Sequence, residues 1–313
     1  MILHLILLFG GILLLYLGAE WLIRGSAELG TRLGVRPIII GLTIVSVGTS
    51  APELVVCILA VLQDSPELVM GNVLGSNLAN VGLILGIAAF LHPLAVAPRV
   101  VRRDIPWMLV ITLVTVPLFW NLSFGRLEGI LLLVILAIYL GLLVPKARVE
   151  GEAILKETGE RRIETLKDVL VPVGLVAAGS VALVGGGQGI VRGATSLAAE
   201  LGVPELMVGL SVVAIGTSLP ELATTVVAAA RKEVDLAVGN IVGSNIFNLT
   251  FVLGGTAMVR PFEISERVLM VGLPVTFAVS LLLLPLAIHR HMIGRTKGMI
   301  LLAGYVAAWV ILS

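Results

Sequence analysis

The chain has 313 residues, of which 58% are apolar and only 13% are charged. Soluble domains contain about a quarter charged residues, so this composition excludes a soluble fold and indicates a helical membrane protein. The formal net charge of +1 provides no basic field for binding nucleic acid, and the single cysteine, Cys57, cannot form an intramolecular disulfide. Neither an HExxH pair nor a GxxxxGK[ST] segment occurs. We therefore expect no enzyme activity, no resident cofactor and no ATP-driven pumping.

Apolar runs separated by short polar breaks predict ten membrane-spanning helices. Each needs about 20 apolar residues to cross a bilayer. The first run has no positively charged n-region and is too long for a signal peptide, so we expect the mature protein to retain it. In chain order the expected spans are 2–23, 37–62, 67–91, 105–121, 125–145, 168–191, 204–230, 236–259, 268–288 and 297–312.

The only long polar break, 146–167, contains charges of both signs and is predicted to be a solvated connecting loop. Lys and Arg concentrate in cytoplasmic loops, and 17 of the 21 basic residues fall in one set of alternate breaks that includes this one. The other set contains only Arg126, Arg192, Arg260 and Arg267. We therefore expect loop 146–167 to be cytoplasmic and both termini to be extracellular.

The two halves of the chain are copies of one unit. Residues 41–86 align with 209–254 without a gap, at a constant offset of 168, and 19 of the 46 positions are identical. The sequence therefore predicts a five-helix repeat at 1–145, the loop 146–167 and a second repeat at 168–313. Because five is odd, the second copy enters the membrane from the opposite side. Inverted repeats are typical of secondary transporters, whose site lies near the bilayer midplane between the repeats.

Glu53 and Glu221 occupy matching positions inside apolar spans. A charge at the bilayer centre costs at least about 2.5–3.5 kcal/mol on insertion scales, so such residues face polar cavities and commonly mark ion pathways. The motif around both is G-T-S-x-P-E. Its proline removes a backbone donor and leaves carbonyls near Thr49 and Thr217 without a helical partner. Carbonyls, hydroxyls and a carboxylate are hard ligands that suit Na⁺, Ca²⁺ or Mg²⁺.

A second motif, G-N-x-x-G-S-N-x-x-N, follows each glutamate. Residues four apart share a helix face, so Ser76 with Asn80, and Ser244 with Asn248, could complete a coordination shell. The G-x-x-x-G spacing within the motif also fits a helix-packing face. The remaining asparagines are expected mainly to tie helices together and rank second as ligands: Asn72, Asn77, Asn240 and Asn245.

The paired GTSxPE and GNxxGSNxxN segments resemble the two α-repeats of the cation/calcium exchanger superfamily, and in particular prokaryotic Na⁺/Ca²⁺ exchangers. The resemblance implies ten helices in a prokaryotic-type cell membrane, with helices 2, 3, 7 and 8 enclosing the ion sites. It assigns Ca²⁺ to Glu53, Glu221 and the carbonyls of Thr49 and Thr217. It assigns Na⁺ to Ser50, Ser76 and the Ser46 carbonyl in one repeat, and to Ser218, Ser244 and the Ala214 carbonyl in the other. It also implies that helices 1 and 6, glycine-rich at Gly10-Gly11 and Gly185-Gly186-Gly187, slide as a gate.

The sequence departs from several members of that superfamily at one position. They have Asp at one of the two positions matching Asn80 and Asn248, whereas both are Asn here. The predicted core therefore has a charge of −2, which one Ca²⁺ or two Na⁺ would neutralise. The expected function is a secondary Na⁺/Ca²⁺ antiporter working by alternating access. The alternatives are Ca²⁺/H⁺ exchange, because protons compete with cations for buried carboxylates, and a passive cation channel.

Overall fold

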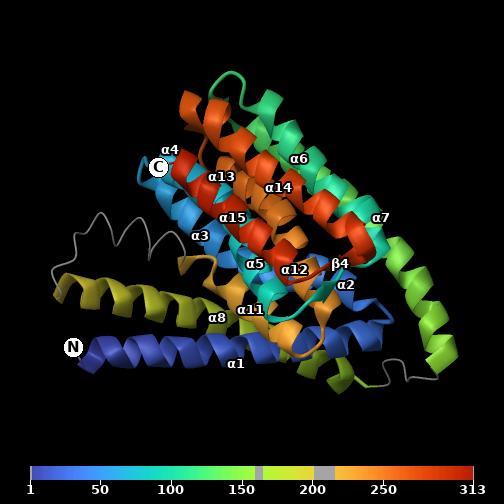
Figure 1. The fold of residues 1–313 in the computed structure, drawn as a ribbon. Helices are drawn as coiled ribbons and strands as arrows, with labels where there is room; N and C mark the ends of the chain where they lie inside the picture. Colours follow the sequence, from blue (N-terminus) through green and yellow to red (C-terminus); the bar gives the residue numbers. More distant parts are fainter. Residues whose placement is uncertain (1, 159–164, 201–215, 313) are drawn as a thin grey trace.

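The computed structural model describes residues 2–158, 165–200 and 216–312, almost all of them helical (Figure 1). Several helical stretches contain a π-helical segment (η) that continues directly into an α-helix. The first half contains α1 (Ile2–Leu33), then α2 (Pro37–Ile40), η1 (Gly41–Val45) and α3 (Ser46–Leu62), then α4 (Pro66–Leu78), η2 (Ala79–Ile84) and α5 (Leu85–Leu91), then η3 (Val100–Asp104) and α6 (Ile105–Leu118), and α7 (Arg126–Thr158). The second half contains α8 (Lys167–Glu200), α11 (Leu219–Ala230), then α12 (Val234–Phe247), η5 (Asn248–Val252) and α13 (Leu253–Val259), then η6 (Val268–Gly272), α14 (Leu273–Ile288) and the 3₁₀ turn η7 (His289–His291), and α15 (Arg295–Leu312).

These elements form ten helical stretches in the described part of the chain, five in each half. Eight of them are long and apolar enough to cross a membrane. Of the other two, the stretch 100–118 begins with three charged residues, and α11 borders the segment 201–215, which lies outside the described residues. The predicted fold class, an all-α membrane protein of two five-helix repeats, is confirmed.

Three predicted helix ends fall well short of those in the structure, and one of them is that of α8, which continues beyond position 191 to Glu200. Helix α1 continues ten residues beyond position 23 to Leu33, and α7 continues through much of the segment predicted as a loop, to Thr158. For α1 and α7 the helix runs past the end of the apolar pattern. A membrane span is limited by the bilayer thickness, but a helix can continue beyond it, and here α1 continues through Gly25 and Gly30 and α7 through Pro145 and Gly151.

The halves are joined by two short antiparallel ribbons. Strand β1 (Leu94–Ala95) pairs with β4 (Met292–Ile293), and β2 (Ser123–Phe124) pairs with β3 (Phe262–Glu263), so each ribbon contains one strand from each half. Turn geometry also repeats at the offset of 168, because Asp64 and Lys232 both adopt positive φ angles, 54° and 65°. The pseudo-symmetry therefore extends beyond the motifs to the connections between helices.

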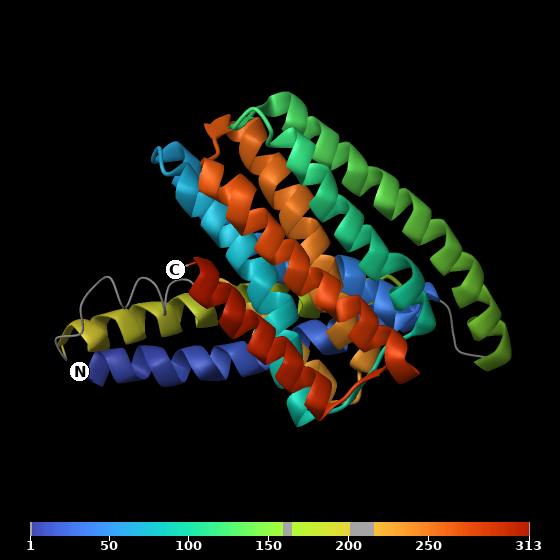
Figure 2. The ribbon, with the colours of Figure 1, turned by 45° about the horizontal axis from the view of Figure 1, so that its top comes forward.

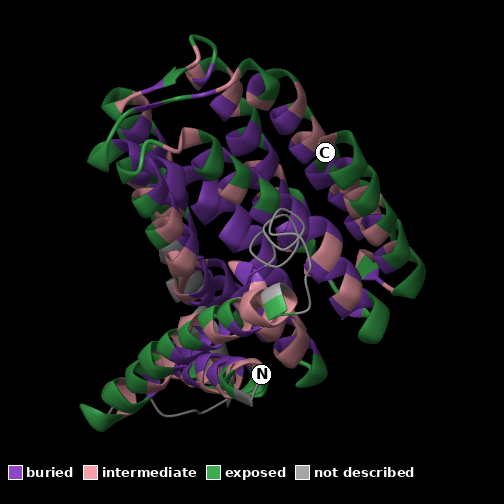
Figure 3. Ribbon diagram, turned by 90° about the vertical axis from the view of Figure 1, so that its left-hand side faces the viewer, coloured by how far each residue is buried: buried purple, intermediate pink, exposed green. Residues whose placement is uncertain are grey.

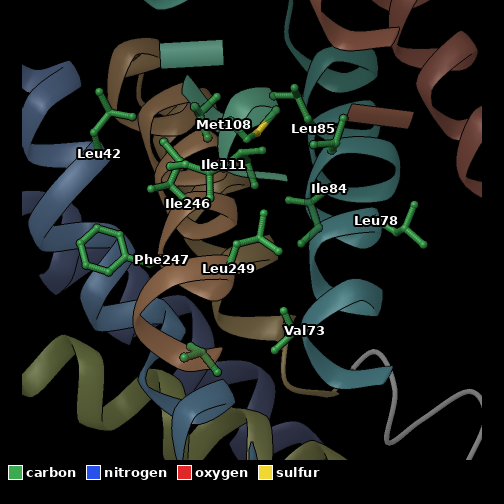
Figure 4. Close-up of a cluster of buried hydrophobic side chains, with 14 of the residues drawn as sticks. Leu42, Val73, Leu78, Ile84, Leu85, Met108, Ile111, Ile246, Phe247 and Leu249 are labelled. Carbon is green, nitrogen blue, oxygen red and sulfur yellow. The ribbon is translucent and has the colours of Figure 1, made fainter. Parts of the chain in front are cut away.

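Burial separates a central group of helices from the peripheral ones, which include α1 and α8 as well as α7 and α15. In the most apolar windows of the stretches 234–259 and 66–91, 94% and 78% of the residues are buried, against 33% in α1 and 28% in α8. Figure 3 shows exposed and intermediate residues along the projecting helix pair and buried residues within the bundle. Around α12, Figure 4 shows a tightly packed cluster of apolar side chains: Leu42, Val73, Leu78, Ile84, Leu85, Met108, Ile111, Ile246, Phe247 and Leu249. The central helices are therefore held by an apolar core, which also includes Leu22 of α1 and Leu183 of α8.

Helices α1 and α8 lie side by side and project from the bundle in both ribbon views (Figures 1 and 2). Their contact is a seam of glycines spaced by seven: Gly11, Gly18 and Gly25 on α1, and Gly179, Gly186 and Gly193 on α8. A Cβ atom on Gly18 would lie 2.8 Å from the Gly179 carbonyl oxygen, and one on Gly11 would lie 2.7 Å from the Gly186 carbonyl oxygen. No side chain separates the two backbones at these crossings.

Candidate ion-binding site

Two carboxyl groups lie at the centre of the bundle, one from each half. Glu53 on α3 and Glu221 in the first turn of α11 are both 0% exposed. Among the described residues, none forms a hydrogen bond with any of their four carboxyl oxygens. The two carboxyl groups are close enough to repel each other. Buried polar groups are normally hydrogen-bonded, so an unpartnered pair of acids indicates a site that receives positive charge.

Hydroxyl groups of the first half lie beside both acids. The Ser76 hydroxyl lies near the Glu53 carboxyl, and the hydroxyls of Thr49 and Ser50, which belong to the first half, lie near Glu221 in the second. Five neutral oxygens predicted as ligands are also buried and unpartnered within the described residues: Ser50 Oγ, Ser76 Oγ, Asn80 Oδ1, Ser218 Oγ and Asn248 Oδ1. Carboxylate, hydroxyl and amide oxygens are the ligands of hard cations.

The backbone near the glutamates differs between the halves. Pro52 lies inside the continuous helix α3, whereas Thr217 lies in a turn and Pro220 in the first turn of α11. Neither proline has a backbone N–H group, so the carbonyls four residues earlier, at Gly48 and Gly216, lose their helical donors. The carbonyl of Ala214, which the resemblance assigns to Na⁺, lies outside the described residues.

Asn80 and Asn248 both lie near the start of a π-helical segment. Asn80 is the second residue of η2, and Asn248 is the first residue of η5. π-helical turns are rare and are frequently found at functional sites. The Asn80 amide nitrogen donates to Asn245 Oδ1 at 3.0 Å, and that of Asn248 donates to Asn77 Oδ1 at 3.1 Å. These bonds fix both amide groups and leave their oxygens available to a cation.

Asn77 and Asn245 join the repeats reciprocally. The Asn77 amide nitrogen donates to the Asn245 carbonyl at 3.3 Å, and that of Asn245 donates to the Asn77 carbonyl at 3.2 Å. Helices α4 and α12 are therefore tied together by polar bonds next to the acids. Such interhelical bonds are a common source of specificity between helices packed in a membrane.

Asn72 and Asn240 each bind a threonine of the opposite repeat. The Thr49 hydroxyl donates to Asn240 Oδ1 at 3.1 Å, and the Thr217 hydroxyl donates to Asn72 Oδ1 at 3.2 Å. Ser244 differs from its repeat partner Ser76, because its hydroxyl lies 3.2 Å from the Thr49 hydroxyl. Sequence reasoning identified these residues but could not identify their partners, which lie in the other half.

The hydroxyl of Ser46 is also engaged, because it donates to the Gly41 carbonyl at 2.7 Å. Its carbonyl, the predicted Na⁺ ligand, lies 3.4 Å from the Thr49 hydroxyl.

Sequence reasoning missed two further residues beside the site. Thr225 and Cys57 occupy matching positions and accept hydrogen bonds from Asn240 and Asn72, respectively. The offset of 168 could have identified this pair, but Thr and Cys do not stand out as identical residues would.

Other acids in or near the helices have partners. Asp104 is 0% exposed, but Arg103 Nε lies 2.6 Å from its carboxyl group. Glu20 forms an ion pair with Arg231, and the Glu128 carboxyl accepts a hydrogen bond from the Gly125 backbone N–H at 2.9 Å. These three carboxyl groups have structural roles that leave Glu53 and Glu221 as the candidates for ion binding.

Comparison with known proteins gives a consistent result over the whole chain. The family described as "Sodium/calcium exchanger protein" matches residues 3–144 and 171–313, one match for each half. The inner membrane protein YrbG of Escherichia coli is 37% identical over 98% of this chain and 95% of its own length. The sodium/calcium exchanger MaX1 of Methanosarcina acetivorans is 32% identical over 96% of both chains.

Among solved structures, the sodium-calcium exchanger NCX_Mj soaked with zero Na⁺ and Ca²⁺ superposes with a TM-score of 0.86. Its sequence is 28% identical, and the match covers 100% of this chain and 99% of that one. The inverted five-helix halves, the duplicated motifs and the full-length matches agree. This chain is an integral membrane transporter that belongs to the sodium/calcium exchanger family.

Proposed function

We propose that the protein is a secondary-active antiporter that exchanges Na⁺ for Ca²⁺ by alternating access. The observation that carries this proposal is the pair of fully buried, unpartnered carboxyl groups of Glu53 and Glu221. They lie between inverted repeats, which is where secondary transporters bind their ions. Because both ions require the same two carboxylates, binding of one excludes full occupancy by the other, and this competition is the basis of exchange.

The charge of the site limits what it can hold. Two ionised glutamates give −2, because Asn80 and Asn248 are neutral. One Ca²⁺ or two Na⁺ neutralise that charge, and a third Na⁺ leaves +1. Ca²⁺ takes six to eight oxygen ligands, so the glutamates need neutral oxygens as well, and we assign the carbonyls of Thr49 and Thr217 to this role.

The serine oxygens are assigned to Na⁺. Ser50, Ser76 and the Ser46 carbonyl would serve one side, and Ser218, Ser244 and the Ala214 carbonyl the other. A transporter that binds Na⁺ needs neutral oxygens to coordinate the ion, whereas a transporter that binds H⁺ needs only a carboxylate. These additional ligands favour Na⁺ over H⁺ as the coupling ion, and the name of the relative MaX1, a sodium/calcium exchanger, agrees with this choice.

Alternating access requires part of the protein to move past the site. Helices α1 and α8 are the candidates, because they project from the bundle and contact each other through glycine backbones. Because the glycines let the two backbones approach closely, α1 and α8 pack as one unit that could shift together along the core. We place both termini outside the cell and the connection 146–167 in the cytoplasm, on the basis of the distribution of Lys and Arg.

Uptake of ⁴⁵Ca²⁺ into proteoliposomes tests this function. Vesicles loaded with Na⁺ and diluted into Na⁺-free buffer should accumulate Ca²⁺, whereas a proton or potassium gradient should not replace the Na⁺ gradient. Accumulation driven by a pH gradient alone would establish Ca²⁺/H⁺ exchange instead. Uptake that needs no counter-ion gradient, and stops at equilibrium, would identify a channel.

A further inference from the structure

Two chains of hydrogen bonds cross between the repeats beside the ion site. In the first, which we name the Thr49 relay, the Thr49 hydroxyl donates to Asn240 Oδ1 at 3.1 Å, and Asn240 Nδ2 donates to the Thr225 hydroxyl at 3.1 Å. Its repeat equivalent is the Thr217 relay. There the Thr217 hydroxyl donates to Asn72 Oδ1 at 3.2 Å, and Asn72 Nδ2 lies 3.3 Å from the sulfur of Cys57.

In residue type, the two relays differ only at the last residue. Thr225 offers a hydroxyl oxygen, whereas Cys57 offers a sulfur, which is a weak hydrogen-bond acceptor. The second N–H group of Asn72 Nδ2 reaches the Glu53 carbonyl at 3.4 Å, which is long for an N–H···O bond, so the Asn72 amide is held by a sulfur acceptor and one long bond. The Asn72 amide, and the threonine that it binds, are therefore held less firmly than Asn240 and Thr49.

The backbone also holds Thr49 more firmly than Thr217. Thr49 lies within helix α3, which fixes its carbonyl, while Thr217 lies in a turn before α11 begins at Leu219. The Thr217 carbonyl thus depends more on its side-chain bond to Asn72 for its position. Cys57, 0% exposed and one helical turn after Glu53, determines the strength of the relay that supplies this support.

We propose that Cys57 is a positioning residue which, through Asn72, sets how firmly Thr217 is held and thereby weakens Ca²⁺ relative to Na⁺ binding. The inference rests on the proposed function for the assignment of the Thr217 carbonyl to Ca²⁺. A divalent ion loses a larger hydration shell than Na⁺ on entering the site and depends more on every well-placed oxygen. A weaker relay therefore lowers Ca²⁺ affinity more than Na⁺ affinity and eases release of Ca²⁺ during the cycle.

The test compares substitutions of equal shape. Cys57→Thr installs the hydroxyl found in the other relay, and Cys57→Val provides a side chain of the same shape as Thr without an acceptor. Equilibrium binding of ⁴⁵Ca²⁺ to purified protein should be tightened by Cys57→Thr about threefold to tenfold, the size of one net hydrogen bond. Cys57→Val should weaken Ca²⁺ binding. In both Cys57 variants, the Na⁺ concentration that displaces half of the bound Ca²⁺, corrected for the Ca²⁺ affinity of the variant, should change less than the Ca²⁺ affinity does.

A second pair of variants protects the test against misfolding at position 57. Thr225→Cys should lower Ca²⁺ affinity toward the value of a chain with two weak relays, and Thr225→Val should lower it further. If Cys57→Thr and Cys57→Val shift Ca²⁺ binding alike, the effect is one of volume and the relay is refuted. Na⁺-driven uptake by the unsubstituted protein is measured in parallel. If this uptake is absent, the proposed function is wrong. The order of Ca²⁺ affinities among the variants tests the relay separately.

Discussion

Among the described residues, Glu53, Glu221 and Asp104 are acids with no solvent exposure, and their surroundings separate two roles. Asp104 lies against the guanidinium of Arg103, which compensates the cost of burying its charge. The two glutamates have no cation beside them in the described part of the chain and lie near each other instead. A carboxylate pair of this kind is stable only when ions or protons occupy the site, and this property suits a transporter.

Replacing either glutamate should therefore abolish transport without loss of the fold. Glu53→Gln or Glu221→Gln keeps the size of the side chain and removes half of the site's charge. We expect Na⁺-driven ⁴⁵Ca²⁺ uptake to fall to background, with a melting temperature equal to or above that of the unsubstituted protein. Glu128→Gln is the matched control and should retain uptake, because its remaining amide oxygen can still accept the Gly125 N–H. Near-normal exchange in both Glu53→Gln and Glu221→Gln would remove these residues from the ion site.

The two motif serines should behave differently when replaced. The Ser76 hydroxyl is unpartnered within the described structure, whereas that of Ser244 is close to the Thr49 hydroxyl. We expect Ser76→Ala to raise the Na⁺ concentration needed for half-maximal exchange with little change in Ca²⁺ affinity. Ser244→Ala should affect both ions, because it also disturbs the Thr49 relay. Equal losses for Na⁺ and Ca²⁺ in Ser76→Ala would mean that this serine serves helix packing.

At the residue scale, the duplicated motifs predicted a set of acids, serines and asparagines as the candidate site. They could not give the hydrogen bonds, because an alignment of the repeats matches Thr49 with Thr217, while the structure pairs Thr49 with Asn240. Contacts between the repeats join non-equivalent positions unless they lie on the pseudo-twofold axis, as Asn77 and Asn245 do. Cys57 was missed as a neighbour of the site because it aligns with Thr225 rather than with an identical residue, and because its importance depends on the contact with Asn72.

At the scale of helices, each predicted span coincides with a helical stretch in the described part of the chain, apart from residues 204–215 of the seventh, which lie outside it, and the main errors were at the ends. The π-helical segments η2 and η5 could not be predicted, because they add one residue to a turn without changing the apolar pattern. The glycines of α1 and α8 were visible in the sequence, but their partners were not. Gly11 and Gly186 lie in the seam, whereas Gly10 and Gly185, which also belong to the predicted glycine-rich segments, have no atom within 4 Å of a Cβ placed on them.

That difference provides a test of the seam. Gly18→Val would place a Cβ 2.8 Å from the Gly179 carbonyl oxygen, and overpacking of this kind costs about 1–3 kcal/mol. We expect the variant to slow exchange strongly while equilibrium Ca²⁺ binding is retained, because the ion site lies on α3, α4, α11 and α12. Gly10→Val carries the same β-branched side chain into open space and should exchange at nearly the normal rate. If both variants exchange equally well, close packing at the α1–α8 seam is not required for the cycle.

At the scale of the whole molecule, the odd number of helices in each repeat predicted the inverted arrangement. The ribbons β1–β4 and β2–β3, each of which pairs a strand of one half with a strand of the other, agree with it.

The orientation in the membrane rests on charge alone. In a Cys57→Ser background, Leu166→Cys, at a position 74% exposed beside α8, should react with an impermeant thiol reagent only from the cytoplasm. Glu266→Cys, in the loop after β3, should react only from outside. Labelling of both from one side, or with the sides reversed, would overturn the proposed topology.

The central claim is that one pair of carboxylates serves both ions. Equilibrium binding of ⁴⁵Ca²⁺ to the purified protein at increasing Na⁺ concentration tests it most directly. Shared ligands predict that Na⁺ raises the apparent Kd for Ca²⁺ steadily, leaves the number of Ca²⁺ sites unchanged, and acts with a Hill coefficient above one, because a single Na⁺ cannot neutralise both glutamates. Binding should disappear in Glu53→Gln. Ca²⁺ binding that is unaffected by Na⁺, or that loses sites while its Kd stays constant, would contradict a shared site.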